Sequence, residues 1–225
     1  MEIFKIFRKK PVEEFISFEV VEKVSGDYTE FERKLTKQSQ IILITGRRGS
    51  GKTALGMKIL ELFCSKSQRK CYALGFLDAK LPWKIKKIDD IEGVKLNSVV
   101  LIDEGAITFS ARDSMKERNK MLGKMMAIAR HKNLSLILIV QNSAMIDLNV
   151  LRLADCLLLK EPSLLQKDFE RGPIKKIYSS VIPHFEKTAD KKSHFFVWDD
   201  DFRGMLKYSL PAFWSEQISK SFKNF

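Results

Sequence analysis

Four residues at fixed spacing could bind a phosphate group: Gly46, Gly51, Lys52 and Thr53. They fit the pattern G-x-x-x-x-G-K-[ST], in which glycines let the backbone wrap closely around phosphate oxygens and direct several N–H groups at them. In this pattern the lysine reaches the β and γ phosphates, and the next hydroxyl binds Mg2+. The residues expected to contact a nucleotide are Gly46, Arg47, Arg48, Gly49, Ser50, Gly51, Lys52, Thr53 and Ala54.

The segments on either side of this loop support a real phosphate site over a chance match in a Gly/Ser loop. Four β-favouring residues, 41–44, precede the loop, and residues 54–63 follow it with apolar side chains at helical spacing. A helix that starts near Lys52 would direct the positive end of its dipole at the same anion.

A second candidate site follows the apolar run SVVLIDE, residues 98–104. A buried parallel strand whose tip faces a ligand crevice has this pattern, a continuous apolar run that ends in two acids. Asp103 would hold Mg2+, directly or through water, and Glu104 would orient the attacking water or accept its proton. The simpler alternative is that both acids start the next loop. Asp103 follows Lys52 by 51 residues, which leaves room for a helix and a strand between them.

A polar amide follows the next apolar run. Residues 134–140 (LSLILIV) predict another buried strand, and Gln141 comes directly after it. The amide could reach the γ-phosphate or the attacking water, or it could cap the following turn. The residues alone leave both possibilities open.

The order of apolar and helical segments indicates the fold class. We expect strands at 18–24 (half-buried), 41–44, 71–76, 98–104, 134–140 and 154–159, and helices at 28–40, 52–65 and 113–131. Strand and helix in alternation predict an α/β fold, in which a mostly parallel central sheet with right-handed crossovers is flanked by helices.

The last part of the chain has a different pattern. We expect strands at 174–182, 193–198 and 205–210, the last two as a hairpin, and then a short C-terminal helix. Asp199, Asp200 and Asp201 predict a solvated turn rather than a metal site, because consecutive residues do not converge on one ion without special loop geometry. In an irregular connection before residue 90, Trp83 is expected to anchor packing rather than to stack on a base.

The charge indicates an acidic partner. The 225 residues include 40 Lys and Arg against 28 Asp and Glu, a formal net charge of +12. Nucleic acid is the commonest partner of such a chain. The cations are spread along the sequence, so a protein with lysine-rich solvated faces would have the same composition.

The cysteines and apolar runs exclude other classes. Cys64, Cys71 and Cys156 are odd in number and form no C-x-x-C pair, so neither disulfides nor zinc are indicated, and a reducing, cytoplasmic setting fits. The longest apolar run, 134–140, is too short to span a bilayer, and residues 1–15 lack the apolar core of a signal peptide. We therefore expect no integral membrane segment.

Three motifs together resemble a known family. GRRGSGKT, SVVLIDEGA and ARHKNLSLILIVQNSAMID are similar to the FtsK/HerA superfamily of DNA-pumping ATPases, above all to its compact archaeal and viral members, which include genome-packaging and zonular-occludens-toxin-like ATPases. The resemblance covers roughly residues 40–162. It implies a RecA-like P-loop NTPase fold, ATP and Mg2+ as cofactors, a homo-oligomeric ring (pentamer or hexamer) and translocation of double-stranded DNA through its pore.

The resemblance also implies an organisation for the chain. Residues 1–38 would form an N-terminal arm, strand and helix that join the core, residues 39–162 the P-loop ATPase core, and residues 163–225 a β-hairpin extension and helix packed on the same domain.

The resemblance further implies roles for residues that match the family motifs. Lys52 and Thr53 correspond to the phosphate-loop pair, Asp103 and Glu104 to the acidic pair, and Gln141 to the polar sensor at the tip of the next strand.

Such rings also need a cation that neutralises charge on the transferring phosphoryl group, usually across a subunit interface. Arg130 is the first candidate; Arg112, Arg47 and Arg48 are the others, and a structural role stays open for each.

The sequence as a whole predicts an ATP-hydrolysing double-stranded DNA translocase of the kind that packages a viral or mobile-element genome. The cation-rich stretch 105–120 is its predicted pore surface. One alternative is a toxin-like assembly or export ATPase that acts on a protein or membrane partner, such as a capsid or export component. A nucleotide switch without hydrolysis is a third possibility, but it would have no need for the carboxylate of Glu104.

Overall fold

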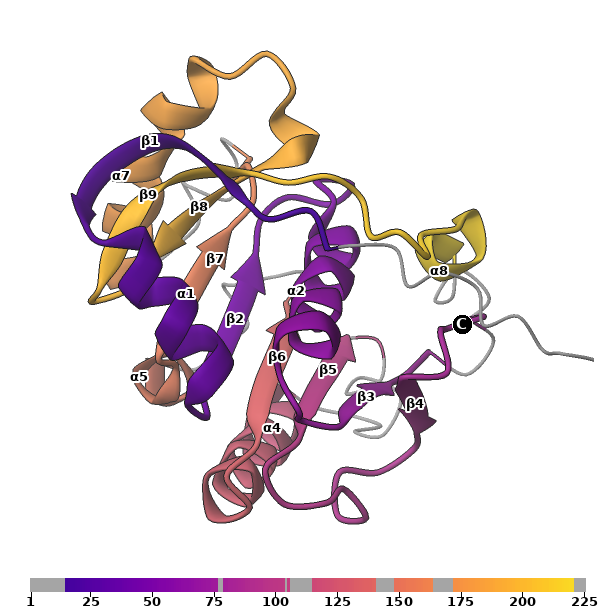
Figure 1. The fold of residues 1–225 in the computed structure, drawn as a ribbon. Helices are drawn as coiled ribbons and strands as arrows, with labels where there is room; N and C mark the ends of the chain where they lie inside the picture. Colours follow the sequence, from indigo (N-terminus) through magenta and orange to yellow (C-terminus); the bar gives the residue numbers. More distant parts are fainter. Residues whose placement is uncertain are drawn as a thin grey trace, which may run out of the picture.

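The computed structural model describes residues 15–76, 79–103, 105, 115–140, 148–163 and 172–220. In these residues one nine-stranded sheet has the strand order β1-β9-β8-β7-β2-β6-β5-β3-β4 (Figure 1). The elements in chain order are β1 (Glu19–Gly26), α1 (Tyr28–Lys37), β2 (Ile41–Thr45), α2 (Lys52–Lys66), β3 (Cys71–Leu74), β4 (Ile85–Ile88), β5 (Val99–Asp103), α4 (Met115–His131), β6 (Ser135–Ile139), α5 (Leu148–Leu153), β7 (Cys156–Leu159), α7 (Gly172–Glu186), η2 (Lys191–Ser193), β8 (His194–Trp198), β9 (Phe202–Lys207) and α8 (Glu216–Lys220).

The predicted fold class is confirmed. The strands from β7 through β2, β6, β5 and β3 to β4 pair in parallel, whereas β8, β9 and β1 add to the β7 side in antiparallel pairs. The parallel part thus ends in an extension made by the C-terminal strands and the first strand of the chain. All parallel strands end at the same edge of the sheet, which is the edge where α/β proteins bind ligands.

Both faces of the central strand β2 are buried. Ile42 and Ile44 belong to the core on the side of α1 and α2, and Ile41 and Leu43 to the core on the side of α4. Because side chains alternate along a strand, an uninterrupted apolar run is what a strand covered on both faces requires. Each such side chain contributes about 1.5–3 kcal/mol when it is fully buried.

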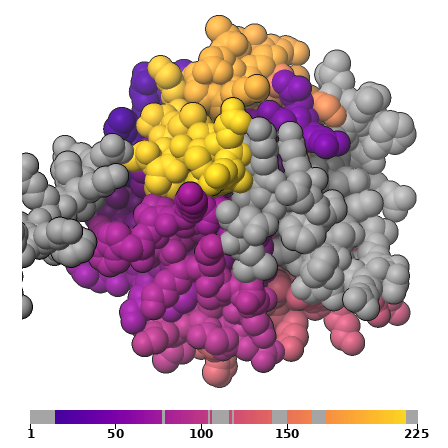
Figure 2. Space-filling model, turned by 90° about the vertical axis from the view of Figure 1, so that its right-hand side faces the viewer, coloured from indigo at the N-terminus to yellow at the C-terminus, as the bar shows by residue number. Residues whose placement is uncertain are grey.

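The C-terminal segment packs on the first half of the chain. The backbone N–H of Ala212 donates to Glu61 Oε1 of α2 at 2.7 Å, and Ile218 of α8 is fully buried in the core that α2 also lines. Figure 2 shows this segment in yellow, against the magenta surface of the β3 and β4 region. The boundaries predicted at residues 38 and 162 stay predictions.

One predicted strand is wrong. Residues 174–182 lie in the helix α7, which buries Ile174, Tyr178, Val181 and Phe185. These side chains recur every three or four residues, so they share one helix face, whereas a strand would place them on alternating faces.

Other local expectations also fail. β1 is mostly exposed instead of half-buried, because it lies at the edge of the sheet. The supposed irregular connection contains β4, and the expected packing anchor before it, Trp83, is 84% exposed. The acidic turn between β8 and β9 is only partly solvated, since Asp199 is buried and Lys34 pairs with it and with Asp201.

Two absences hold for the described part of the chain. None of its helices is both long enough and apolar enough to cross a bilayer. Nor does it bring together three or more histidine, cysteine or acidic side chains that could hold a metal ion.

The helix that follows the loop, α2, approaches the sheet closely at Gly56. A Cβ added there would lie 2.9 Å from the Cδ1 atoms of Leu101 and Ile139, both fully buried. A Cβ added at Gly123 in α4 would instead lie in open space.

We expect Gly56→Ala to destabilise the protein and Gly123→Ala to stabilise it, as measured by urea unfolding. Alanine in place of a helical glycine contributes about 1 kcal/mol. At Gly56, overpacking of about 1–3 kcal/mol outweighs that gain. Equal stabilisation by the two substitutions would contradict the close approach of α2 to β5 and β6.

Candidate nucleotide-binding site

The loop between β2 and α2 has the backbone of a phosphate cradle. Gly46, Gly49 and Gly51 have φ angles of +146°, +75° and +91°. Side chains disfavour such angles, which explains the three glycines. Gly51 is the N-cap of α2 and offers no side-chain cap. No capping side chain therefore accepts from the first N–H groups of the helix, and an anion in the loop can accept from them instead.

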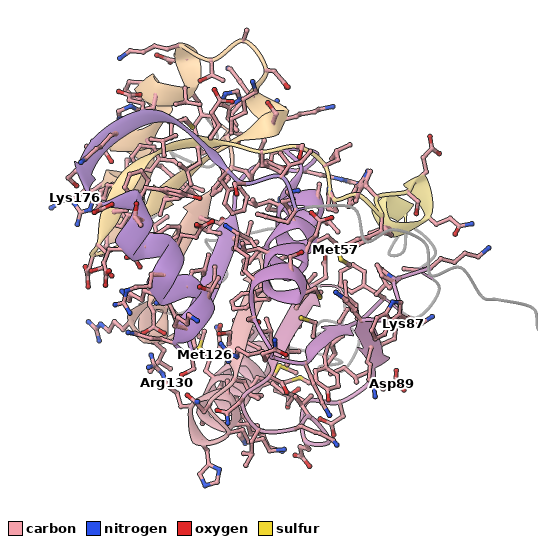
Figure 3. The ribbon with its side chains drawn as sticks, in the orientation of Figure 1. Met57, Lys87, Asp89, Met126, Arg130 and Lys176 are labelled. Atoms are coloured by element: carbon pink, nitrogen blue, oxygen red, sulfur yellow. The ribbon has the colours of Figure 1, made fainter. Side chains whose placement is uncertain are left out.

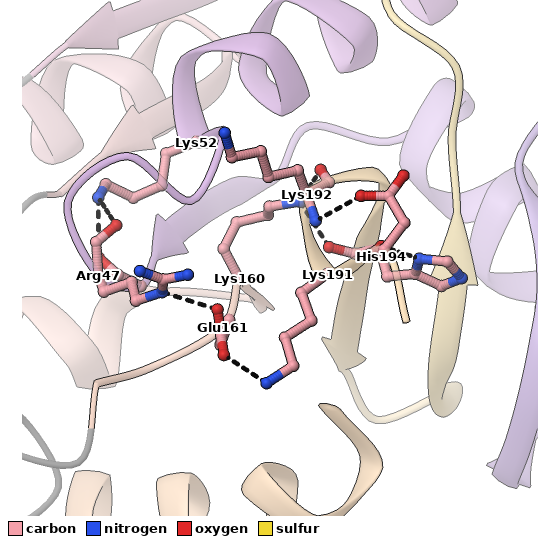
Figure 4. Close-up of polar contacts among 9 residues, drawn as sticks. Arg47, Lys52, Lys160, Glu161, Lys191, Lys192 and His194 are labelled. Carbon is pink, nitrogen blue, oxygen red and sulfur yellow. Dashed lines mark hydrogen bonds and ion pairs between the residues drawn. The ribbon is translucent and has the colours of Figure 1, made fainter. Parts of the chain in front are cut away.

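The ammonium group of Lys52 lies inside this loop. Its side chain is buried, and Nζ donates to the carbonyl oxygens of Gly46 at 2.8 Å and Arg47 at 2.9 Å (Figure 4). A phosphate bound in the cradle would lie next to this positive charge. The position predicted for Lys52 from its spacing therefore fits a bound nucleotide.

Thr53 and Asp103 meet beside the cradle, one in the first turn of α2 and the other at the carboxyl end of β5. The hydroxyl of Thr53 donates to Asp103 Oδ2 at 3.4 Å, and the backbone N–H of Gly105 donates to Asp103 Oδ1 at 3.2 Å. Asp103 is only 2% exposed. A hydroxyl and a carboxylate are oxygen ligands of the kind that Mg2+ prefers, so the donor set fits this ion beside the cradle.

The hydroxyl of Ser50 is a further indication that the loop binds phosphate. This hydroxyl is buried in the loop and has no hydrogen-bond partner in the described part of the chain. A buried hydroxyl without a partner costs about 1–3 kcal/mol, and a phosphate oxygen would satisfy it. The residues present thus fit a nucleotide phosphate.

The two residues after β7 continue its backbone hydrogen bonding along the glycine loop. The N–H of Lys160 donates to Thr45 O at 2.7 Å, and the N–H of Arg47 donates to Glu161 O at 2.9 Å. The carboxylate of Glu161 also binds Arg47 Nε at 2.7 Å and Lys191 Nζ at 2.8 Å. These ion pairs hold the Arg47 side chain on the C-terminal part of the chain. The loop is thereby fastened to the segment after β7.

Sequence reasoning missed Lys160. Its side chain is 0% exposed, and Nζ donates to the carbonyl oxygens of Lys192 at 2.6 Å and His194 at 2.5 Å (Figure 4). Nζ also donates to the hydroxyl of Tyr208 at 3.3 Å. Burial lowers the pKa of Lys160 to about 7. No pattern in the sequence marks it, because a lysine after an apolar strand usually reaches solvent.

The structure places the other predicted residues unevenly. Glu104, Gln141 and Arg112 lie outside the described residues, and their roles stay predictions. So does the predicted pore surface, of which only residues 105 and 115–120 are described. In the loop, Arg48 is exposed and Ala54 is buried in the first turn of α2.

Arg130 lies far from the loop within the chain. It donates to Leu153 O at 3.1 Å and to Asp155 Oδ1 at 2.9 Å, while Asp155 Oδ2 accepts from the N–H of Ile41, the first residue of β2. Arg130 is thus at the amino end of β2, and the loop follows its carboxyl end (Figure 3). Only a neighbouring copy could present Arg130 to the nucleotide, which stays a prediction.

The cradle geometry predicts different outcomes at two of its glycines. A Cβ at Gly46 would lie 2.7 Å from Lys160 Cβ and 2.8 Å from Lys160 O, whereas one at Gly49 would meet nothing within 4 Å. We expect Gly46→Ala to abolish binding of a fluorescent ATP analogue. Gly49→Ala introduces only the backbone strain of a side chain at positive φ, about 1–2 kcal/mol, so it should weaken binding without abolishing it. Equal binding by both variants would contradict the packing of the loop on Lys160.

Solved structures share this fold. The genome-packaging NTPase B204 of Sulfolobus turreted icosahedral virus 2, in complex with AMPPCP, matches with a TM-score of 0.52 at 16% identity, over 77% of this chain and 99% of that chain. The pCW3 conjugation coupling protein TcpA with ATPgS gives 0.51 at 13%, over 83% and 65%. EssC (ATPases 2 and 3) of Geobacillus thermodenitrificans gives 0.51 at 10%, over 96% and 49%.

At these identities the shared property is the fold, so the expected likeness to viral genome-packaging ATPases is confirmed at that level. No curated protein matches the sequence. Residues 25–150, which contain the glycine loop, Asp103 and the strands between them, match the family described as Novel STAND NTPase 3. As this match spans more than half of the 225 residues, the chain belongs to the Novel STAND NTPase 3 family.

Proposed function

We propose that this NTPase hydrolyses ATP to move double-stranded DNA, as a motor that packages a viral or mobile-element genome. The observation that carries the ATPase part is the cradle with Lys52 inside it and the Thr53–Asp103 pair beside it. In support of the motor part, the likeness to B204, whose name describes genome packaging, extends over nearly all of that compact protein.

The residues of the site have separate tasks in this proposal. The loop N–H groups and Lys52 bind the phosphates, and Thr53 and Asp103 hold Mg2+, which supplies charge neutralisation during phosphoryl transfer. Glu104 orients the attacking water and accepts its proton, and Gln141 senses the γ-phosphate. Arg130 of a neighbouring subunit in a pentameric or hexameric ring completes the charge neutralisation.

A surface at one end of the sheet supports a polyanionic partner. Lys70, Lys86 and Lys95, hereafter the basic edge, are all exposed around β3 and β4. The ammonium of Lys70 lies so close to that of Lys95 that the repulsion lowers the pKa of Lys70, and Lys86 adds to this effect. Clustered like charges repel each other, and a row of phosphates would relieve that repulsion.

The ATPase proposal is tested by the steady-state hydrolysis rate with and without linear double-stranded DNA at low salt. We expect DNA to stimulate the wild-type rate. Lys52→Met and Glu104→Gln should each lower it about 100- to 1,000-fold, as removal of one preorganised transition-state group does. Retained ATP binding by Glu104→Gln would assign the defect to hydrolysis.

Other outcomes of this assay contradict parts of the proposal. A rate that DNA does not change would reject the motor and leave an assembly or export ATPase that works on a protein partner. No rate at all, together with nucleotide binding, would leave a switch. Full activity of Lys52→Met would reject the loop as the site.

The DNA proposal is tested by the salt dependence of binding. Replacing the three lysines of the basic edge by alanine should weaken binding and make the logarithm of the binding constant less dependent on the logarithm of the salt concentration. The slope should fall by about one for each DNA phosphate that these lysines neutralise. The matched control replaces Lys175, Lys176 and Lys187, which are also exposed, on and near α7. Figure 3 shows Lys176 at the opposite end of the sheet from Lys87 of β4. Equally weakened binding in both variants would reject the basic edge as a specific DNA-binding surface.

A further inference from the structure

A chain of hydrogen bonds runs from the C-terminal strands to the start of the helix α2. Lys160 Nζ donates to the hydroxyl of Tyr208, and this hydroxyl donates to Gly51 O at 3.2 Å. The same carbonyl accepts the first hydrogen bond of α2, from the N–H of Leu55 at 3.0 Å. The residue at which the cradle becomes a helix is therefore held from outside the loop, by residues that follow β7 and β9.

All the hydrogen-bond donors of the Lys160 ammonium group are satisfied. The three N–H donors of a charged Lys160 meet three acceptors, Lys192 O, His194 O and the Tyr208 hydroxyl. Nζ also lies 4.8 Å from the centre of the Tyr208 ring. A charged ammonium that is fully buried is costly unless all its donors are satisfied, as they are here. The arrangement can thus keep a positive charge inside the protein.

This buried charge is next to the phosphate cradle. A Cβ at Gly51 would lie 3.7 Å from Lys160 Cε and 3.3 Å from the Tyr208 hydroxyl. The ammonium of Lys52 is close enough to lower the pKa of Lys160. Phosphates bound beside Lys52 carry the opposite charge, so they would favour the charged form of Lys160.

We propose that Lys160 and Tyr208 are positioning residues of the nucleotide site, which hold Gly51 in the phosphate-binding conformation and add a second buried cation behind the cradle. This inference rests on the proposed function, because it assigns these two residues to the same nucleotide site. Neither residue touches the γ-phosphate in this proposal. They act on binding, and hydrolysis of bound ATP proceeds without them.

The proposal implies a pH dependence with a definite sign. The charged and titratable groups that face Lys160 are Asp190 and Glu161, which raise its pKa, Lys52, which lowers it, and the Tyr208 phenol. With a pKa of about 7 in the free protein and a higher one when phosphates are bound, nucleotide binding takes up a proton. The contribution of Lys160 to affinity is then greatest below pH 7 and falls as the pH rises through 7.

The test compares Mg2+-dependent binding of a non-hydrolysable ATP analogue at acidic, neutral and mildly alkaline pH in four proteins. These are the wild type, Tyr208→Phe, Lys160→Met and the control Lys192→Met, which removes an exposed cation nearby but keeps the backbone carbonyl that Lys160 uses. We expect Tyr208→Phe to raise the Kd about 3- to 10-fold, the worth of one hydrogen bond. Lys160→Met should raise it at least as much and reduce the pH dependence relative to the wild type, in which the titrating phosphate of the analogue contributes as well, and Lys192→Met should change neither.

The turnover parameters provide the second readout. Tyr208→Phe should raise the KM for ATP and leave kcat unchanged, since it weakens binding without touching the reacting groups. A purely structural role, in which Lys160 only joins β7 to β8, would lower thermal stability and leave both the Kd and its pH dependence as in the wild type.

Each outcome decides a separate claim. Failure of the wild type to bind the analogue rejects the proposed nucleotide site itself. Normal binding by a folded Tyr208→Phe, or a pH dependence in Lys160→Met equal to that of the wild type, rejects the positioning role and leaves the nucleotide site standing. Should Lys160→Met not fold, Tyr208→Phe decides, because it keeps the ring and removes only the hydroxyl.

Discussion

The parallel pairing of β2 with β6 on one side and β7 on the other is the constraint on which the rest of the structure depends. Since parallel strands end at one edge, this pairing brings the glycine loop beside the segment after β7 and, one strand beyond β6, beside Asp103. The hydrogen-bond ladder does not stop with β7. It continues through Lys160 and Glu161 to Arg47, inside the loop itself. The cradle is therefore an extension of the sheet.

The buried lysines of the described residues lie in and beside the helix α2. Lys52, Lys58 and Lys160 are all buried. Lys58 is stabilised by Glu61 at 2.6 Å and by the ring of Phe15, whereas Lys52 and Lys160 have carbonyl oxygens as acceptors. Burying a charge is unfavourable unless it is paired or hydrogen-bonded. The carboxylate of Glu61 neutralises Lys58, whereas the carbonyl dipoles around Lys160 accept its hydrogen bonds without neutralising its charge.

The sequence predicted those parts of the fold in which one local signal was sufficient. The glycine spacing and the apolar runs before it and before Asp103 indicated both the parallel sheet and the phosphate cradle, because burial on two faces leaves little freedom of composition. α7 was missed because Ile174 and Val181 favour strands by type, and only their spacing indicates a helix. Lys160 could not be predicted, since its partners Lys192, His194 and Tyr208 come together only through the pairing of β7, β8 and β9.

The antiparallel edge of the sheet joins distant parts of the sequence. Among the residues that the structure describes, β1 pairs only with β9, and Glu19 lies opposite Lys207. During synthesis on the ribosome, β1 cannot form this pairing until β9 has emerged. Contacts of such high sequence separation form late and slowly, because loop closure costs entropy before the pairing stabilises anything. Until then Val20, Val21 and Val24 belong to an unpaired strand, and the parallel core from β2 to β7 can assemble before it.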